Sequence, residues 1–326
     1  LPLNVSRSAL QNDGFVKKIS EYISKKVADK LSGMCKTDRE TYEKYWDDIN
    51  PFIKFGCLKD TKFSDRMMDY ILYKNLDGKY LTLEDYLKEN ETEEEAKEEA
   101  ETVIEENKEE TAEEIKKDAE EGKEPEKTTV YYVTDEVQQS QYINMFKEEG
   151  QDALILKHNI DSAFISHVEQ KKETVKFMRI DADINESVKA DGEENLEEQT
   201  KELGEIFKKA LGKENLTVKA EKLKNESVSS MMTVTEESRR MQEMMKMYNM
   251  YGMDPSMFGG AGETLVLNAN NKLVQYVLNH GEGENTNKIC EQLYDLALLA
   301  HGSLSPERMT GFVARTNEIM MMLAEK

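Results

Sequence analysis

Arg7 is the residue of this chain that is best placed to do chemistry. It lies in the opening segment 1–11 (LPLNVSRSALQ), where a single guanidinium is surrounded by apolar and small polar side chains. A guanidinium in such a loop makes either a surface ion pair or a contact with a phosphate group that another domain presents. The residues alone leave both interpretations open.

Methionine gives the second chemical signal, because nine of the eighteen methionines lie between Met231 and Met257. At 100° per residue, one broad helical face collects most of the thioether and tyrosine side chains of this segment. Its members are Met241, Met244, Met245, Tyr248 and Tyr251, with Met247 at the edge. Such a stripe is either a core face or a flexible apolar surface that binds many partners. Met231, Met232 and Met250 are expected to be ordinary packing residues.

The remaining motifs predict no catalytic or metal site. The four histidines, His158, His167, His280 and His301, are scattered, and no pair has the spacing that places two metal ligands on one helical face. The chain also lacks a Walker loop and a G-x-S-x-G motif. These residues therefore favour a module for binding and assembly over a complete enzyme.

The composition predicts a multi-domain protein in a reducing compartment. The 326 residues include 44 Lys and Arg against 66 Asp and Glu, and the net charge of −22 repels nucleic acid and anionic membranes. Three distant cysteines suggest neither disulfides nor a zinc site, and no apolar run approaches the roughly 20 residues of a membrane helix, so we expect a cytoplasmic location. The chain begins at Leu1 instead of Met, which we interpret as a piece of a longer protein without its first domain.

Two segments of different character make up the first part of the chain. Residues 1–88 are expected to be helical, with one helix that stops before Pro51 and another that begins at a capping box formed by Thr82 and Asp85. Residues 89–127 are an acidic, low-complexity insertion that cannot form a core. The insertion is either a solvated segment or an acidic arm that binds a basic partner.

The second part of the chain predicts a mixture of α/β and α+β structure. Residues 128–185 alternate strand, helix, strand, helix and strand, which indicates a small βαβαβ subdomain with a parallel sheet. A polar linker at 186–194 leads to a mixed C-terminal domain at 195–326, with a strand expected at 216–218.

The C-terminal domain ends in two amphipathic helices, at about 286–301 and 306–323. Ser305 is a candidate N-cap, and Pro306 suits the first helical position. The short connection and matched apolar stripes predict an antiparallel pair, which a second copy would complete to a four-helix bundle. We therefore favour a homodimer over packing of the pair onto its own domain. The predicted interface consists of Ile289, Leu293, Leu296, Phe312, Val313, Ile319 and Leu323.

Several motifs resemble those of the heat-shock protein 90 family, most closely its bacterial members. The opening segment 1–11 is similar, over many consecutive positions, to the middle-domain catalytic loop of that family. The resemblance covers nearly the whole chain. It continues through Tyr45-Trp46, Phe55-Gly56, Leu83–Tyr86, Val130–Thr134, and Leu296–Ala300 followed by Gly302.

The resemblance implies part of the middle domain and the C-terminal dimerisation domain of a stress-response chaperone, without the N-terminal ATPase domain. It implies that Arg7 and Gln11 act on ATP, bound with Mg to the absent domain of the longer protein. By itself this chain is expected to hold no cofactor and no metal, and not to be an enzyme.

The resemblance also implies two kinds of protein partner: partly unfolded clients, and a second copy bound through the terminal helices. The implied client contacts are Met241, Met244, Met245, Met247, Tyr248, Tyr251 and Phe164. Phe164 is included because many relatives carry an aromatic residue one position earlier, where this chain has Ala163. The alternative is a dimeric scaffold that binds no client of its own.

Overall fold

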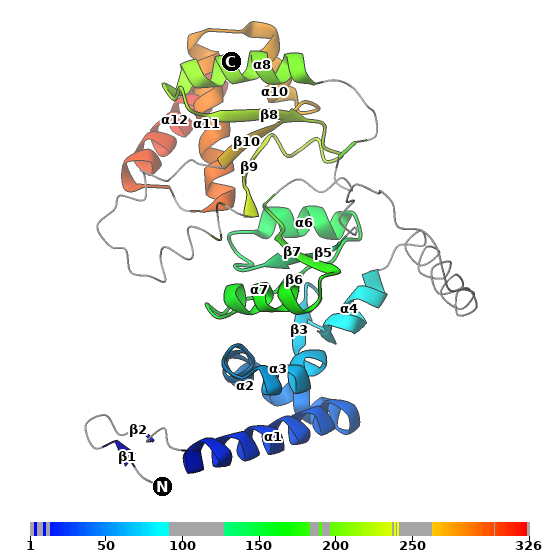
Figure 1. Ribbon diagram of the computed structural model, residues 1–326. Helices are drawn as coiled ribbons and strands as arrows, with labels where there is room; N and C mark the ends of the chain where they lie inside the picture. The colour runs from blue at the N-terminus through cyan, green and yellow to red at the C-terminus, as the bar shows by residue number, and fades with distance from the viewer. Residues whose placement is uncertain are drawn as a thin grey trace, which may run out of the picture. The chain divides into compact units, whose positions relative to one another are not determined.

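The computed structural model describes residues 14–90, 127–182, 189–190, 196–236, 238, 240, 263–302 and 304–324, together with the backbone of residues 3–4 and 9–10. The chain divides into two compact units, which are Leu1–Val130 with Leu154–Phe177, and Tyr131–Ala153 with Met178–Lys326. The subdomain expected at 128–185 contributes residues to both units. Helices and strands are labelled in Figure 1.

Helices α1, α2 and α3 of the first unit pack against one another (Figure 1). The helices of this unit are α1 Gly14–Thr37, α2 Arg39–Lys59, α3 Thr61–Met67, the 3-10 helix η1 Met68–Tyr70, α4 Leu83–Asn90 and α7 Asp161–Lys171. The Asp60 carboxylate caps α3 by accepting hydrogen bonds from the backbone N–H groups of Lys62 and Phe63. The predicted capping box of α4 is confirmed, because Asp85 N donates to Thr82 Oγ1 at 3.1 Å and Thr82 N donates to Asp85 Oδ2 at 3.3 Å.

Helix α2 corrects one prediction, because it continues through Pro51 to Lys59. A proline inside a helix removes a backbone hydrogen bond and costs about 3 kcal/mol. Trp46, Ile53 and Cys57, on both sides of the proline, are buried in the core. Burial of large apolar side chains contributes roughly 1.5–3 kcal/mol each, which offsets the cost of the proline.

A β-hairpin interrupts the segment that we expected to be helical throughout. Its strands are β3 Leu72–Asn75 and β4 Tyr80–Thr82, which pair antiparallel. The Asn75 side chain accepts hydrogen bonds from the backbone N–H groups of Asp77 and Lys79, and Gly78 has a φ of 80°, which favours glycine. The helical prediction was wrong here, since a short buried run does not distinguish strand from helix by its periodicity.

The hairpin belongs to a five-stranded sheet of order β4-β3-β6-β5-β7. Its other strands are β5 Thr128–Val133, β6 Leu154–Ile155 and β7 Val175–Arg179. They are the three strands expected within 128–185, and α6 (Ser140–Glu148) and α7 separate them in sequence. However, β3 pairs antiparallel with β6, with Lys74 opposite Ile155. The expectation of a small, purely parallel sheet is corrected accordingly.

The second unit contains a three-stranded mixed sheet of order β8-β10-β9. Its strands are β8 Thr217–Glu221, β9 Ser230–Val234 and β10 Glu263–Asn268. Strand β10 is parallel to β8 and antiparallel to β9, so that Leu265 lies opposite both Val218 and Met232. The strand expected at 216–218 is confirmed within β8. Met231 and Met232 are buried in β9, which confirms that they are packing residues.

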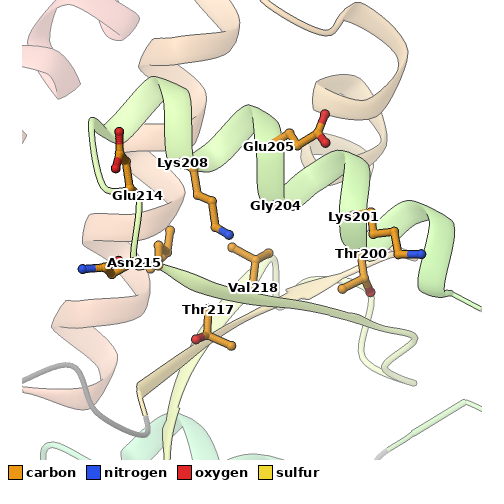
Figure 2. Close-up of a pocket in the computed structure, with 10 residues that line it drawn as sticks. Thr200, Lys201, Gly204, Glu205, Lys208, Glu214, Asn215, Thr217 and Val218 are labelled. Carbon is orange, nitrogen blue, oxygen red and sulfur yellow. The ribbon is translucent and has the colours of Figure 1, made fainter.

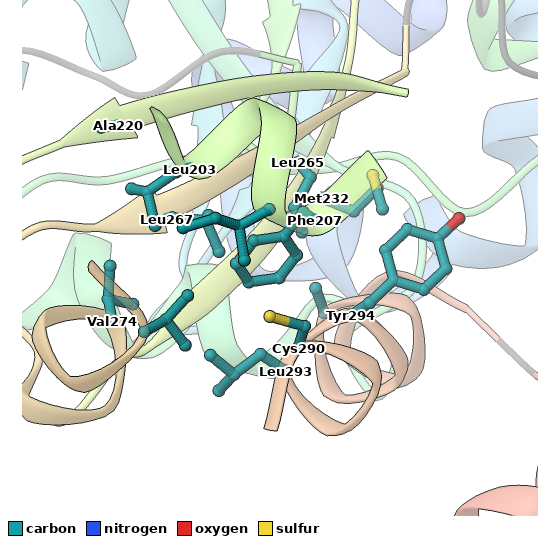
Figure 3. Close-up of a cluster of buried hydrophobic side chains, with 13 residues drawn as sticks. Leu203, Phe207, Ala220, Met232, Leu265, Leu267, Val274, Cys290, Leu293 and Tyr294 are labelled. Atoms are coloured by element: carbon teal, nitrogen blue, oxygen red, sulfur yellow. The ribbon is translucent and has the colours of Figure 1, made fainter. Parts of the chain in front are cut away.

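The core of the second unit lies between this sheet and three helices (Figure 3). The helices are α8 Glu197–Leu211, α10 Lys272–His280 and α11 Glu284–His301. Leu265 and Leu267 are two positions apart in β10, so their side chains lie on the same face of the sheet. On that face they belong to one buried cluster with Phe207 of α8 and Cys290 of α11. Gly212 ends α8 with a φ of 62°, the left-handed conformation common at helix C-termini.

The remaining features of the described residues are the hydropathy of the helices and the state of the cysteines. None of the helices in the described ranges is long and apolar enough to cross a membrane. Cys35, Cys57 and Cys290 are buried free thiols. Burial raises the pKa of Cys57 and of Cys290 to about 12, so both remain protonated and weakly nucleophilic near neutral pH.

Candidate functional site

The last helix of the second unit, α12 (Pro306–Ala324), has no buried residue. Four of its apolar side chains fall on one side of the helix at 100° per residue, and all four are exposed. They are Met309 (37% exposed), Val313 (51%), Met320 (54%) and Leu323 (68%). These four residues are called the α12 face below. Exposure of this much apolar surface marks an interaction site.

Charged and polar groups hold α12 against α11. The buried Asp295 of α11 accepts hydrogen bonds from Arg308 Nη2 at 2.5 Å and from Arg315 Nη2. Arg315 Nη1 also donates to Glu291 Oε2 at 2.7 Å, and Gln292 Nε2 donates to Thr316 Oγ1 at 3.1 Å. This polar seam holds α12 in place while the α12 face stays exposed.

The structure separates the predicted dimer residues into three groups. Leu293 is a correction: it is buried in the core of its own unit, so its side chain is not available to a second copy. Ile289, Phe312 and Ile319 are half-buried. Leu296, Val313 and Leu323 are exposed.

The methionine segment, residues 235–262, connects two paired strands of the second unit. Strand β9 ends at Val234, which pairs with Glu263, the first residue of β10. The intervening residues are therefore an excursion from two hydrogen-bonded neighbouring strands. Insertions of this length within a compact domain are often functional. Met241, Met244, Met245, Met247, Tyr248 and Tyr251 lie outside the described residues.

The start of the methionine segment is anchored by hydrogen bonds. Thr235 acts as an N-cap there, because Ser238 N donates to Thr235 Oγ1 at 3.3 Å. Glu236 Oε1 accepts hydrogen bonds from Tyr132 Oη and from Arg240 Nε, each at 2.9 Å. These contacts fix the direction in which the chain leaves β9.

Phe164 does not fit the predicted client contact. Its side chain is 0% exposed, and its ring lies 5.5 Å from Lys54 Nζ within the first unit. A client could reach this ring only if the core opened. Phe164 lies on α7, and the sequence did not reveal which face of that helix is covered.

Asp181 is a buried acidic residue of the second unit that no sequence motif indicated. The buried Asp181 accepts hydrogen bonds from Arg179, and its Oδ2 lies 3.2 Å from His301 Nδ1 at the end of α11. Burial by itself would raise the pKa of Asp181, but His301 and Arg179 lower it to about 2. Asp181 is therefore a carboxylate at neutral pH.

The described part of the opening segment consists of two short strands. Strands β1 (Leu3–Asn4) and β2 (Ala9–Leu10) pair antiparallel, with Asn4 opposite Ala9. Arg7 and Gln11 themselves lie outside the described residues.

A cavity of about 430 Å³ lies between α8 and β8. Figure 2 shows Thr200 and Lys208 of α8 above Thr217 and Val218 of β8. Lys201, Lys208, Glu205 and Glu214 give its lining both signs of charge. Thr200 Oγ1 accepts a hydrogen bond from Ala220 N at 3.0 Å, so this threonine joins helix to strand. In the described ranges, no group of three or more His, Cys, Asp and Glu side chains is placed to hold a metal ion.

Comparison with known proteins identifies the family. The family model described as Hsp90 protein matches residues 1–95 and 121–325, which is most of the chain. The chain belongs to the Hsp90 family. Residues 96–120, which the match omits, lie within the acidic segment.

Members of the Hsp90 family from three bacteria are similar to this chain. The chaperone protein htpG of Bacteroides fragilis strain YCH46 is 35% identical over 298 residues, which cover 87% of this chain and 38% of the relative. The HtpG proteins of Bacteroides thetaiotaomicron and Porphyromonas gingivalis strain ATCC 33277 are 33% and 31% identical, over 86% and 87% of this chain and 38% of each relative. The chain thus spans about two fifths of the length of these relatives.

Proposed function

We propose that this chain is the dimerising and client-holding portion of an Hsp90-family chaperone that acts in the cytoplasm. The observation that carries the proposal is the α12 face, whose four apolar side chains are exposed although α12 is fixed to its own unit. Membership of the Hsp90 family and the relatives named chaperone protein HtpG support the chaperone role. The buried free cysteines are compatible with a reducing compartment.

The dimer forms through α12, with Leu296 of α11 beside it. An isolated pair of helices cannot bury both of its apolar stripes, whereas a second copy completes a four-helix arrangement. A two-fold symmetric contact uses the same surface on both chains. The α12 face of each chain would therefore be covered by the α12 face of the other. The polar seam at Asp295 keeps the orientation of α12 fixed in each chain.

Clients bind the methionine segment. Thioether side chains adapt to differently shaped apolar surfaces, which suits a protein that holds many unfolded sequences. The hydrogen bonds of Thr235 and Glu236 support this proposal, since they give an adaptable surface a fixed point of departure. Met244, Met247 and Tyr248 are the principal contacts.

Replacement of these three residues tests client binding. Substituting Met244, Met247 and Tyr248 together with Gln should weaken binding of a fluorescently labelled, permanently unfolded reporter protein by at least about tenfold, because burial of one such side chain contributes roughly 1.5–3 kcal/mol. Met250→Gln is the matched control, since Met250 points away from the apolar face on a helical wheel. Equal affinities of the triple variant and the control would contradict client binding here and leave a dimeric scaffold.

A second function belongs to the longer protein, in which Arg7 contacts the γ-phosphate of ATP bound to another domain. The pairing of Asn4 with Ala9 supports this proposal, because Arg7 falls between these two paired residues in the sequence. In a chain that includes the nucleotide-binding domain, Arg7→Ala should lower the rate of hydrolysis by about 10³-fold, as loss of an arginine at a transferring phosphate does. Lys17→Ala, on the exposed side of α1, is the control, and unchanged hydrolysis by Arg7→Ala would rule the role out. This chain alone should not hydrolyse ATP.

A further inference from the structure

A second cavity, of about 220 Å³, lies in the first unit between α2, the β3–β4 hairpin and the loop that follows β6. It is smaller than the roughly 300–1,000 Å³ that drug-sized ligands occupy. Four of the lining residues have basic side chains, and only one of the described lining residues has a carboxylate. The basic residues are Lys54, Lys74, Lys157 and His158, and the acidic residue is Asp47. Lys54 is paired with the buried Asp161, so Lys74 and Lys157 are the basic groups that outnumber the one lining carboxylate.

The inner wall of this cavity carries an amide oxygen that has no hydrogen-bond partner among the described residues. Asn50 is 8% exposed, and its Oδ1 is buried with no hydrogen-bond partner among the described residues. A buried polar atom left unpaired costs about 1–3 kcal/mol. Because rotation of the amide exchanges Oδ1 with Nδ2, the side chain can present a donor or an acceptor to a molecule in the cavity.

A buried ammonium lies one helical turn beyond Asn50. Lys54 Nζ donates a hydrogen bond to Asp161 Oδ1 at 2.6 Å, and lies 5.6 Å from the centre of the Tyr73 ring. An ammonium has three N–H groups, so it can bind Asp161 and a ligand oxygen together. The lining carboxylate, Asp47, forms a hydrogen bond with Tyr80. Burial and this hydrogen bond raise the pKa of Tyr80 to about 12.

We propose that this cavity binds a small anion, with a carboxylate or phosphate group held by Asn50 and Lys54. Lys74 and Lys157 at the rim attract the anion, and charge-assisted hydrogen bonds inside hold it. All of the lining residues belong to the first unit.

The only tryptophan of the chain, Trp46, lines the cavity and is a built-in reporter. Titration of the whole chain with sodium acetate, and separately with sodium phosphate, at constant ionic strength should change Trp46 fluorescence with half-saturation on the order of 1 mM. Acetamide, which has nearly the shape of acetate but no charge, should cause no saturable change. Saturation by acetate alone identifies a carboxylate ligand, by phosphate alone a phosphate ligand, and by both an unselective anion site.

Two variants establish that the fluorescence change comes from this cavity. Asn50→Asp keeps the shape of the side chain but adds a negative charge, and should weaken anion binding by at least about tenfold. Lys157→Gln, at an exposed rim position where folding is not at stake, should weaken it by about twofold to fivefold. Gln199→Leu, which removes another buried unpaired amide oxygen in the second unit, should leave it unchanged. The proposal is overturned if neither anion saturates, if acetamide matches acetate, or if Lys157→Gln and Asn50→Asp both bind as the unaltered chain does.

Discussion

Lys54 and Asp161 form an ion pair whose side chains are 2% and 5% exposed. Burial lowers the pKa of the Lys54 ammonium, and the attraction of Asp161 opposes that change. Lys54→Met should therefore destabilise the first unit by about 3–5 kcal/mol, because it leaves the Asp161 carboxylate buried without its partner. Urea unfolding followed by Trp46 fluorescence measures the loss.

A double variant is the control for this prediction. Lys54→Met with Asp161→Asn removes both charges but keeps an oxygen for His158 N, which donates to Asp161 Oδ2 at 2.9 Å. It should recover most of the lost stability, since no unpaired charge stays buried. A single variant as stable as the unaltered chain would show that the ion pair contributes nothing.

Asp181 predicts a specific dependence of stability on pH. Its pKa is about 2 in the folded chain against an ordinary value of 3.8, so its contribution, about 2 kcal/mol, is present above pH 4 and is lost as the pH falls towards 2. Asp181→Asn should lose less stability than the unaltered chain across that window, measured by urea unfolding at each pH. Glu202→Gln, at an exposed carboxylate of the same unit, is the control. Equal acid losses for Asp181→Asn and Glu202→Gln would contradict the assigned role.

At the scale of single residues, the sequence predicted helix caps better than burial. The capping box of Thr82 and Asp85 is local, so its residues are visible in the sequence itself. The buried positions of Phe164 and Leu293 depend on which helix face other elements cover, which no local pattern reveals. Asp181 gave no signal, because its partner His301 is distant in sequence.

Helix α12 is an element whose position depends on Asp295. Asp295→Asn removes the negative charge that Arg308 and Arg315 share, and should speed amide hydrogen exchange in α12 by about tenfold to a hundredfold, since hydrogen bonds to charged groups contribute about 1.5–3 kcal/mol. Exchange measured by mass spectrometry on peptides from 306–324 checks this. Glu291→Gln, at a partly exposed neighbour that binds the same Arg315, should have a much smaller effect. Unchanged exchange in Asp295→Asn would mean that apolar contacts hold α12.

At the scale of elements, long amphipathic helices were predicted well and short strands poorly. Strands β3, β9 and β10 are short runs with little alternation between buried and exposed positions, so their periodicity resembles that of a buried helix. Pro51 led to the wrong prediction that a helix stops before it. Helix α2 continues because tertiary burial outweighs the local cost of the proline.

At the scale of the whole molecule, the order of helices and strands in the C-terminal part was only partly predictable. The terminal helix pair followed from its apolar stripes, and α11 and α12 have nearly the expected bounds. The mixed sheet did not, because β9 and β10 pair across the long methionine segment. Contacts between residues so distant in sequence leave no local pattern from which they could be predicted. The resemblance to the Hsp90 family was visible in the sequence because it rests on motifs of consecutive residues.

The molar mass of the chain in solution tests the proposed chaperone dimer most directly. Light scattering coupled to gel filtration, at micromolar concentration, should give twice the mass of the 37.5 kDa chain. Val313→Asp with Met320→Asp places two charges on the α12 face and should give the mass of a single chain, whereas Ala314→Asp, on another side of the helix, should remain dimeric. A single-chain mass for the unaltered protein, or a dimer that survives both charges on the α12 face, would contradict the proposed interface.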